Sequence, residues 1–182
     1  FMLQQTQVSR VELYYDRFIT RWPTIHDLAR ARPSAVRECW EGLGYYRRAT
    51  NLHRLARTVV EQRAGVMPSG TEELRALPGV GRYTAGAIAT FAFERRSAAV
   101  DTNVARVIRR AFHPRLATKG AEQRVWSTAT ALLPRTGSAS WAFNQGIMEL
   151  GAVICTARVA RCGACPVRAV CVTGKRLKKG DG

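Results

Sequence analysis

Four cysteines near the C-terminal end constrain this chain more than any other feature of its sequence. Cys155, Cys162, Cys165 and Cys171 lie within 17 residues and are separated by six, two and five residues. Disulfide frameworks are typical of small secreted chains, and no secretory signal is visible here. A zinc site usually pairs two short Cys-x-x-Cys units across a longer gap, whereas this sequence has one such unit. The pattern therefore favours four thiolates on one loop around a single inorganic cluster, in a reducing compartment.

Apolar residues recur at helical spacing along most of the chain. No segment shows sustained alternation of apolar and polar residues, so the sequence predicts an all-α fold. Hydrophobic residues make up 46% of the chain, which is enough for a packed core. No run of about 18 apolar residues is present, so we expect no membrane span. The predicted helices include residues 2–20, 24–28, 71–77, 82–93, 101–112, 119–133 and 140–151.

The chain is strongly basic. It has 29 Lys and Arg residues against 13 Asp and Glu, a net charge of +16. A folded domain with this charge attracts polyanions, and nucleic acid is the usual partner. An arginine-rich proteome would produce the same composition, so the charge supports nucleic-acid binding without proving it.

A glycine-rich turn separates two predicted helices over Leu77–Thr84. Gly79 and Gly81 permit positive φ and close approach of the backbone to a ligand, and Val80 can anchor the turn inward. Free amides at the start of the second helix would then bind a DNA phosphate without reading sequence. An ordinary helix–helix turn is the alternative, but the surrounding charge favours the DNA-binding hairpin. The predicted DNA contacts in this segment are Gly79, Val80, Gly81, Arg82 and Thr84.

Asp101 stands at the start of a predicted helix, 20 residues after Gly81. Helix-start amides favour an ionised carboxylate. Cleavage of a glycosidic bond passes through an oxocarbenium-like transition state, which such a carboxylate can stabilise or attack. A plain N-cap aspartate is the competing interpretation.

The hairpin and the segment Val100–Asn103 together resemble the iron–sulfur helix-hairpin-helix DNA glycosylases, which include endonuclease III and the adenine glycosylases of the MutY type. The resemblance extends over essentially all 182 residues. It implies a six-helix-barrel lobe over residues 1–97 and a lobe over 98–182 that carries the catalytic aspartate and the cluster. It also implies that Asp101, Tyr83 and Asn103 are the catalytic residues. The six-two-five cysteine spacing resembles the family's [4Fe–4S] loop.

Three further segments indicate which base is removed. Bifunctional relatives carry a lysine where this chain has Tyr83, and a phenol cannot form a Schiff base, so we expect a monofunctional enzyme. Met2–Val8 resembles an adenine-glycosylase segment in which Gln5 would insert into the DNA stack. Trp40–Ala49 resembles a second one, in which Tyr45 would wedge beside the damaged guanine. The resemblance therefore implies base-excision repair by hydrolysis of the N-glycosidic bond of adenine opposite 8-oxoguanine or guanine.

Two departures from the family pattern qualify this prediction. The family's general acid is a glutamate that would fall immediately before Phe1, so we expect an N-terminally truncated chain with little activity. Only 11 residues follow Cys171, too few for the additional domain that helps relatives recognise 8-oxoguanine. A thymine or uracil glycosylase acting opposite guanine is therefore an alternative, although Gln4–Gln7 favours adenine.

A non-catalytic helix-hairpin-helix DNA-binding module is an alternative from another class, since the hairpin and the charge would serve it equally well. In either case the expected partner is double-stranded DNA, here with a mismatch or an oxidised guanine. We expect a monomer in the bacterial cytoplasm, associated with the nucleoid.

Overall fold

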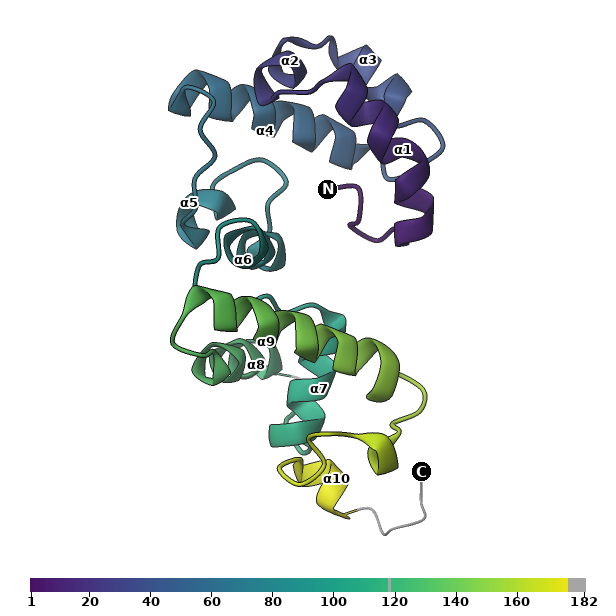
Figure 1. The fold of residues 1–182 in the computed structure, drawn as a ribbon, viewed down its shortest axis with the longest axis vertical. Helices are drawn as coiled ribbons and strands as arrows, with labels where there is room; N and C mark the ends of the chain where they lie inside the picture. The colour runs from purple at the N-terminus through teal and green to yellow at the C-terminus, as the bar shows by residue number, and fades with distance from the viewer. Residues whose placement is uncertain (118, 177–182) are drawn as a thin grey trace. The chain divides into compact units, whose positions relative to one another are not determined.

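The computed structural model describes residues 1–117 and 119–176, and these are helical with connecting loops (Figure 1). The described residues contain no β-strand, only an isolated bridge between Cys155 and Ala160, so the all-α prediction is confirmed. The helices are α1 (Val8–Arg21), α2 (Ile25–Arg30), α3 (Pro33–Cys39), α4 (Arg47–Arg63), α5 (Thr71–Arg75), α6 (Arg82–Phe91), α7 (Thr102–Phe112), α8 (Ala121–Leu132), α9 (Gly137–Glu149) and α10 (Val172–Arg176). None of the helices described has the length and apolar character that crossing a membrane requires.

The chain forms two compact units. Unit 1 comprises residues 1–68 and 75–80, and unit 2 comprises residues 69–74 and 81–182. The predicted boundary between residues 97 and 98 is therefore not where the units separate.

Packing around α6 explains why unit 2 begins earlier than predicted. A Cβ built on Gly86 would overlap the Ala98 carbonyl oxygen. Helix α6 therefore lies directly against the loop that precedes α7. Phe91 at the end of α6 makes an edge contact with Trp141 of α9, with ring centroids 5.6 Å apart. These contacts join α6 to the cysteine-bearing part of the chain.

Unit 1 is built from α1 to α4, and α2 and α3 both pack on α4. Its core contains Trp40, which is fully buried, with the Phe18 ring 6.0 Å away in an edge contact. The first helix begins at Val8 rather than at residue 2, because residues 1–7 form turns in which Gln5 has a φ of 58°. A left-handed residue cannot continue an α-helix, so the Gln5 segment stays outside α1.

Unit 2 is packed around α7, which contacts α8, α9 and α10. The buried face of α7 consists of Val104, Val107, Ile108 and Ala111, at helical spacing. The end of α9 differs from the prediction: the α-helix stops at Glu149 and continues as a π-helical turn over Leu150–Ile154. This wider turn leads directly into Cys155.

Two helical glycines provide a test of this packing. We expect Gly86→Ala to destabilise the protein by about 1–3 kcal/mol, because the new methyl would overlap the Ala98 carbonyl. The matched variant is Gly146→Ala in α9, where an added Cβ meets nothing within 4 Å. That change should stabilise the protein by about 0.5–1 kcal/mol through helix propensity. Denaturant unfolding of both variants checks the prediction, and equal effects of the two would contradict it.

Candidate active site

The Asp101 carboxylate is held at the start of α7. Its Oδ1 accepts a hydrogen bond of 2.7 Å from the Val104 amide, and its Oδ2 accepts one of 3.1 Å from the Asn103 side-chain amide. Asp101 is half-buried and has extended backbone, as an N-cap residue does. Asp101 therefore caps α7, and its carboxylate also lines a hollow, so capping does not exclude a catalytic role.

A hydrogen-bonded chain connects Asp101 to the cysteine-bearing loop. The Arg106 Nη2 donates to Asn103 Oδ1 at 2.8 Å and to the Gly151 carbonyl at 2.5 Å. The Arg106 Nε donates to the Cys155 carbonyl at 2.8 Å. Asn103 therefore has both ends of its amide engaged, which fixes its rotamer and with it the orientation of the Asp101 carboxylate.

Asp101 and Tyr83 line the same hollow in unit 2, of about 610 Å³. Tyr83 comes from the first turn of α6 and is 40% exposed. Burial raises the pKa of the Tyr83 phenol above its usual value, and the nearby Asp101 carboxylate raises this pKa further. The other residues that line the hollow are Val100, Thr102, Ala105, Arg109, Ala121, Glu122, Val125 and Trp126. The structure thus places Tyr83 and Asp101, which the resemblance assigned to one catalytic site, around the same hollow.

The two glycines of the turn differ in backbone conformation, and Val80 between them points inward. Gly79 has a φ of 77°, and a Cβ there would lie 2.6 Å from the Asn51 side chain, so the position requires glycine. Val80 is buried, as expected. Gly81 has a φ of −83°, so it does not use the positive φ that a glycine permits. It is the N-cap of α6 with extended backbone and open space at its Cβ position.

The two side chains of this turn with predicted DNA contacts differ in their surroundings. The Arg82 guanidinium lies 4.0 Å from the centroid of the Trp126 ring, a cation–π contact within unit 2. Thr84 is partly buried in the first turn of α6. The Gly81 N-cap has no side chain to accept from the first amides of α6, which leaves this end of the helix suited to an anion.

Gln5 and Tyr45 both lie in unit 1 and are exposed, and Tyr45 has 61% of its surface accessible. Both have backbone in the left-handed region, with φ of 58° and 47°. Non-glycine residues rarely adopt this conformation, and such residues concentrate at functional sites. Both side chains are therefore accessible, and their contact with DNA stays a prediction.

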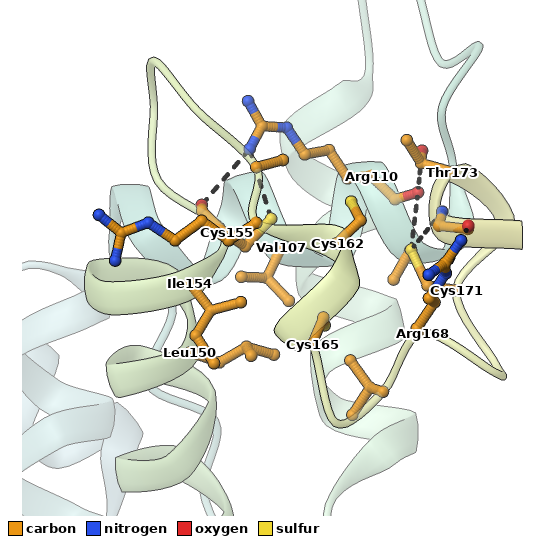
Figure 2. A pocket seen from close by; sticks show the side chains of 15 residues that line it. Val107, Arg110, Leu150, Ile154, Cys155, Cys162, Cys165, Arg168, Cys171 and Thr173 are labelled. Carbon is orange, nitrogen blue, oxygen red and sulfur yellow. Dashed lines mark hydrogen bonds between the residues drawn. The ribbon is translucent and has the colours of Figure 1, made fainter. Parts of the chain in front are cut away.

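The four cysteines of the C-terminal loop line a single cavity (Figure 2). The Arg110 Nη1 donates to the Cys155 Sγ at 3.3 Å, and the Gly174 amide donates to the Cys171 Sγ at 3.2 Å. Burial raises the pKa of the Cys162 thiol, and the other three cysteines raise this pKa further. The cavity wall also contains Val107, Leu150 and Ile154.

This cavity has the donor set that an iron–sulfur cluster uses. Among residues 1–117 and 119–176, no three Cys, His, Asp or Glu side chains are grouped as a single metal ion requires. A four-iron cluster does not require its cysteines to meet at one point, because they surround a larger inorganic body. Four thiols on one partly apolar cavity, two of them receiving N–H donors, fit such a cluster.

Sequence reasoning missed the residues that support the site. Arg106 and Arg110 lie in a basic run, which by itself indicates only a positive surface. Their spacing of four residues on α7 places both on one face, and this is the sequence signal that could have suggested a shared role. Trp126 carried no signal, because an apolar position on a helix indicates only burial.

An all-helical chain with a glycine turn between α5 and α6 defines a class, the helix-hairpin-helix proteins. The chain belongs to the HhH-GPD superfamily of base excision DNA repair proteins, whose family model matches residues 1–129. It is 45% identical to the human adenine DNA glycosylase over 98% of this chain and 33% of that relative. It is 46% identical to the adenine DNA glycosylase of Mycolicibacterium smegmatis over 92% of this chain and 56% of the relative. The chain therefore spans between a third and somewhat more than half of these relatives.

The fold is also similar to a solved structure, that of a thermostable thymine-DNA glycosylase. The TM-score is 0.86 at 30% sequence identity, and the match covers 97% of this chain and 81% of the other.

The pairing of Tyr83 with Asp101 predicts an altered phenol titration. We expect Tyr83 to ionise at higher pH than free tyrosine, since burial and the negative neighbour both disfavour phenolate. The Asp101→Asn variant should lower this pKa but leave it above that of free tyrosine, because burial is the larger cause. Ultraviolet absorbance titration, with Tyr83→Phe subtracted as the control, measures the shift. A pKa of Tyr83 that is unchanged by Asp101→Asn would show that the two groups do not interact.

Proposed function

We propose that this chain is the catalytic part of a monofunctional adenine DNA glycosylase, which hydrolyses the N-glycosidic bond of adenine paired with 8-oxoguanine or guanine. The observation that carries the proposal is the Asp101 carboxylate, held by two hydrogen bonds and facing an open hollow beside Tyr83. The proposed ligand is double-stranded DNA bound by a monomer, in the bacterial nucleoid.

The proposed chemistry uses the fixed carboxylate. As the bond between the deoxyribose and adenine breaks, positive charge develops on the sugar, and the Asp101 carboxylate stabilises or captures it. Water then supplies the hydroxyl that replaces the base, and the remaining proton balances the one with which neutral adenine leaves. Asn103 keeps the carboxylate in place through its hydrogen bond to Oδ2. Tyr83 provides a neutral phenol in the hollow and no amine, so the sugar is not converted into a Schiff base.

The proposed DNA contacts come from both units. Amides of the Gly79–Thr84 turn would bind phosphate. Gln5 and Tyr45 would enter the stack around the mispair, where an amide and an aromatic ring offset the lost stacking. The choice of adenine over thymine rests on the relatives: the adenine glycosylases are 45–46% identical to this chain, and the thymine glycosylase is 30% identical.

The proposed cofactor is a [4Fe–4S] cluster held by Cys155, Cys162, Cys165 and Cys171. When bound, it would cross-link the loop and add no step to bond cleavage. Arg110 would then donate to a ligand sulfur, as it does to Cys155 Sγ in the structure.

Replacing the carboxylate tests the enzymatic proposal. We expect Asp101→Asn to slow adenine excision by at least about 100-fold, because the charge that stabilises the cation is lost. Binding to the duplex should change by less than about twofold, since asparagine can still cap α7. The assay is single-turnover excision from an adenine:8-oxoguanine duplex, with a chain that carries the expected glutamate before Phe1.

Glu149→Gln is the matched control, since it removes one carboxylate from unit 2 at an exposed position on α9. It should leave excision unchanged. Equal excision by Asp101→Asn and the parent would overturn the enzymatic role, and binding without any excision by the parent would favour the non-catalytic module. Excision of thymine opposite guanine instead of adenine would favour the thymine glycosylase alternative.

The cofactor proposal has its own test. We expect purified protein to contain about four iron and four sulfide ions per chain. Cys162→Ala should lower the iron content sharply, whereas Cys39→Ala, which replaces the buried cysteine of unit 1, should not. Iron and sulfide analysis with visible absorption measures both, and zinc in place of iron would contradict the proposal.

A further inference from the structure

Arg48 is a buried cation in unit 1, only 7% exposed, whose hydrogen bonds reach two separate segments. On the N-terminal segment its Nη1 donates to the carbonyls of Phe1 at 3.2 Å, of Met2 at 2.7 Å, and of Gln4. On the loop before α4 its Nη2 donates to the carbonyls of Leu43 at 3.4 Å and Gly44 at 3.1 Å. One guanidinium thus connects both segments.

A cation in this position is costly to keep. Burial lowers the pKa of Arg48, and its Nε is buried without a hydrogen-bond partner. Arginines are rarely buried to this degree unless they are paired. Apolar side chains could fill the place of this buried cation. The arginine therefore has a specific geometric use, for which its rigid fork of N–H donors is suited.

Two of the carbonyls that accept from Arg48 lie directly before the exposed residues Gln5 and Tyr45. The Gln4 carbonyl belongs to the peptide immediately before Gln5, and the Gly44 carbonyl to the peptide immediately before Tyr45. These are the peptides that define the positive φ of both residues, 58° and 47°. A donor on each carbonyl fixes each peptide plane and so stabilises a conformation that these residues seldom adopt.

The Arg48 guanidinium also contacts the rings on the Tyr45 side. Its central carbon lies 5.4 Å from the Tyr45 ring centroid and 5.5 Å from that of the buried Trp40. The Trp40 Nε1 donates to the same Gly44 carbonyl at 3.2 Å. The Tyr45 ring is therefore oriented by its backbone and by the cation together, while 61% of its surface stays accessible.

We propose that Arg48 is a positioning residue whose guanidinium holds Gln5 and Tyr45 as one preformed probe for the DNA stack. This inference rests on the proposed function, because it requires that Gln5 and Tyr45 enter the duplex. Both residues are ordered before DNA arrives, so the conformational entropy of arranging them is not lost during insertion. Without Arg48 the two segments would relax from their left-handed conformations, and opening of the mispair would suffer more than binding of the backbone.

The test compares a paired duplex with one that is already open. A 2-aminopurine next to the mispair reports unstacking by a rise in fluorescence, and affinity is measured on the same duplex and on a duplex with a one-nucleotide gap at that place. For Arg48→Met we expect the fluorescence rise to fall at least about fivefold and affinity for the paired duplex to fall about tenfold, while affinity for the gapped duplex stays within about twofold. Arg48→Lys keeps the charge but not the fork of donors. Its fluorescence rise and its affinity for the paired duplex should lie between those of the parent and of Arg48→Met.

Arg47→Met is the matched control, because it removes one positive charge at the neighbouring exposed position. It should lower affinity for both duplexes by the same small factor and leave the fluorescence rise intact. Thermal unfolding accompanies each variant, and Arg48→Lys carries the comparison if Arg48→Met does not fold. Equal losses on paired and gapped duplexes, or no loss on either, would overturn the positioning role.

Gln5→Ala and Tyr45→Ala separate this inference from the function on which it rests. If both variants open the duplex as the parent does, the proposed DNA contacts of Gln5 and Tyr45 fail. If they lose the fluorescence rise while Arg48→Met and Arg48→Lys keep it, the contacts stand and the role of Arg48 fails. If Gln5, Tyr45 and Arg48 act as one unit, the double variant of Arg48→Met with Tyr45→Ala should keep at least the fluorescence rise of the more impaired single variant.

Discussion

The hydrogen bond from the Val104 amide to the Asp101 carboxylate is the interaction on which unit 2 depends. It sets the start of α7, and α7 is the helix that α8, α9 and α10 contact. The buried side of α7 forms the core, while Arg106 and Arg110 on another side reach the cysteine-bearing loop. Because one helix carries the core, the carboxylate and the contacts to the cysteines, a shift in its start would disturb all three.

Backbone carbonyls are the main partners of the arginines that organise this protein. Arg48, Arg106 and Arg110 each donate to carbonyl oxygens from segments distant in sequence. A chain with 29 basic and 13 acidic residues cannot pair most of its cations with carboxylates. Part of the high positive charge therefore stabilises loops from within, and the basic composition overstates the charge that is available to bind DNA.

The two units place their special residues in different ways. In unit 2, Asp101 is held by side-chain and helix-end hydrogen bonds, so its position follows from local sequence. In unit 1, Gln5 and Tyr45 are held through their backbones by Arg48, 43 residues from the first and three from the second. The sequence around Arg48 indicates a helix but not which carbonyls the guanidinium reaches, which is why Arg48 was not among the predicted site residues.

Sequence alone determined the helical fold, a helix start at Asp101, a glycine turn at residues 79–81 and the four cysteines of one loop, because each depends on residues close together in the chain. It permitted a left-handed backbone at both glycines of the turn, whereas only Gly79 adopts one, and it placed the boundary between units at residue 98 instead of at the hairpin. Only the tertiary structure decided that Arg109 and Trp126 line the hollow of Tyr83 and Asp101 and that Arg48 and Arg106 join distant segments. The physical reason is that these contacts form when helices pack, and helical periodicity records which face of a helix is buried but not which neighbour buries it.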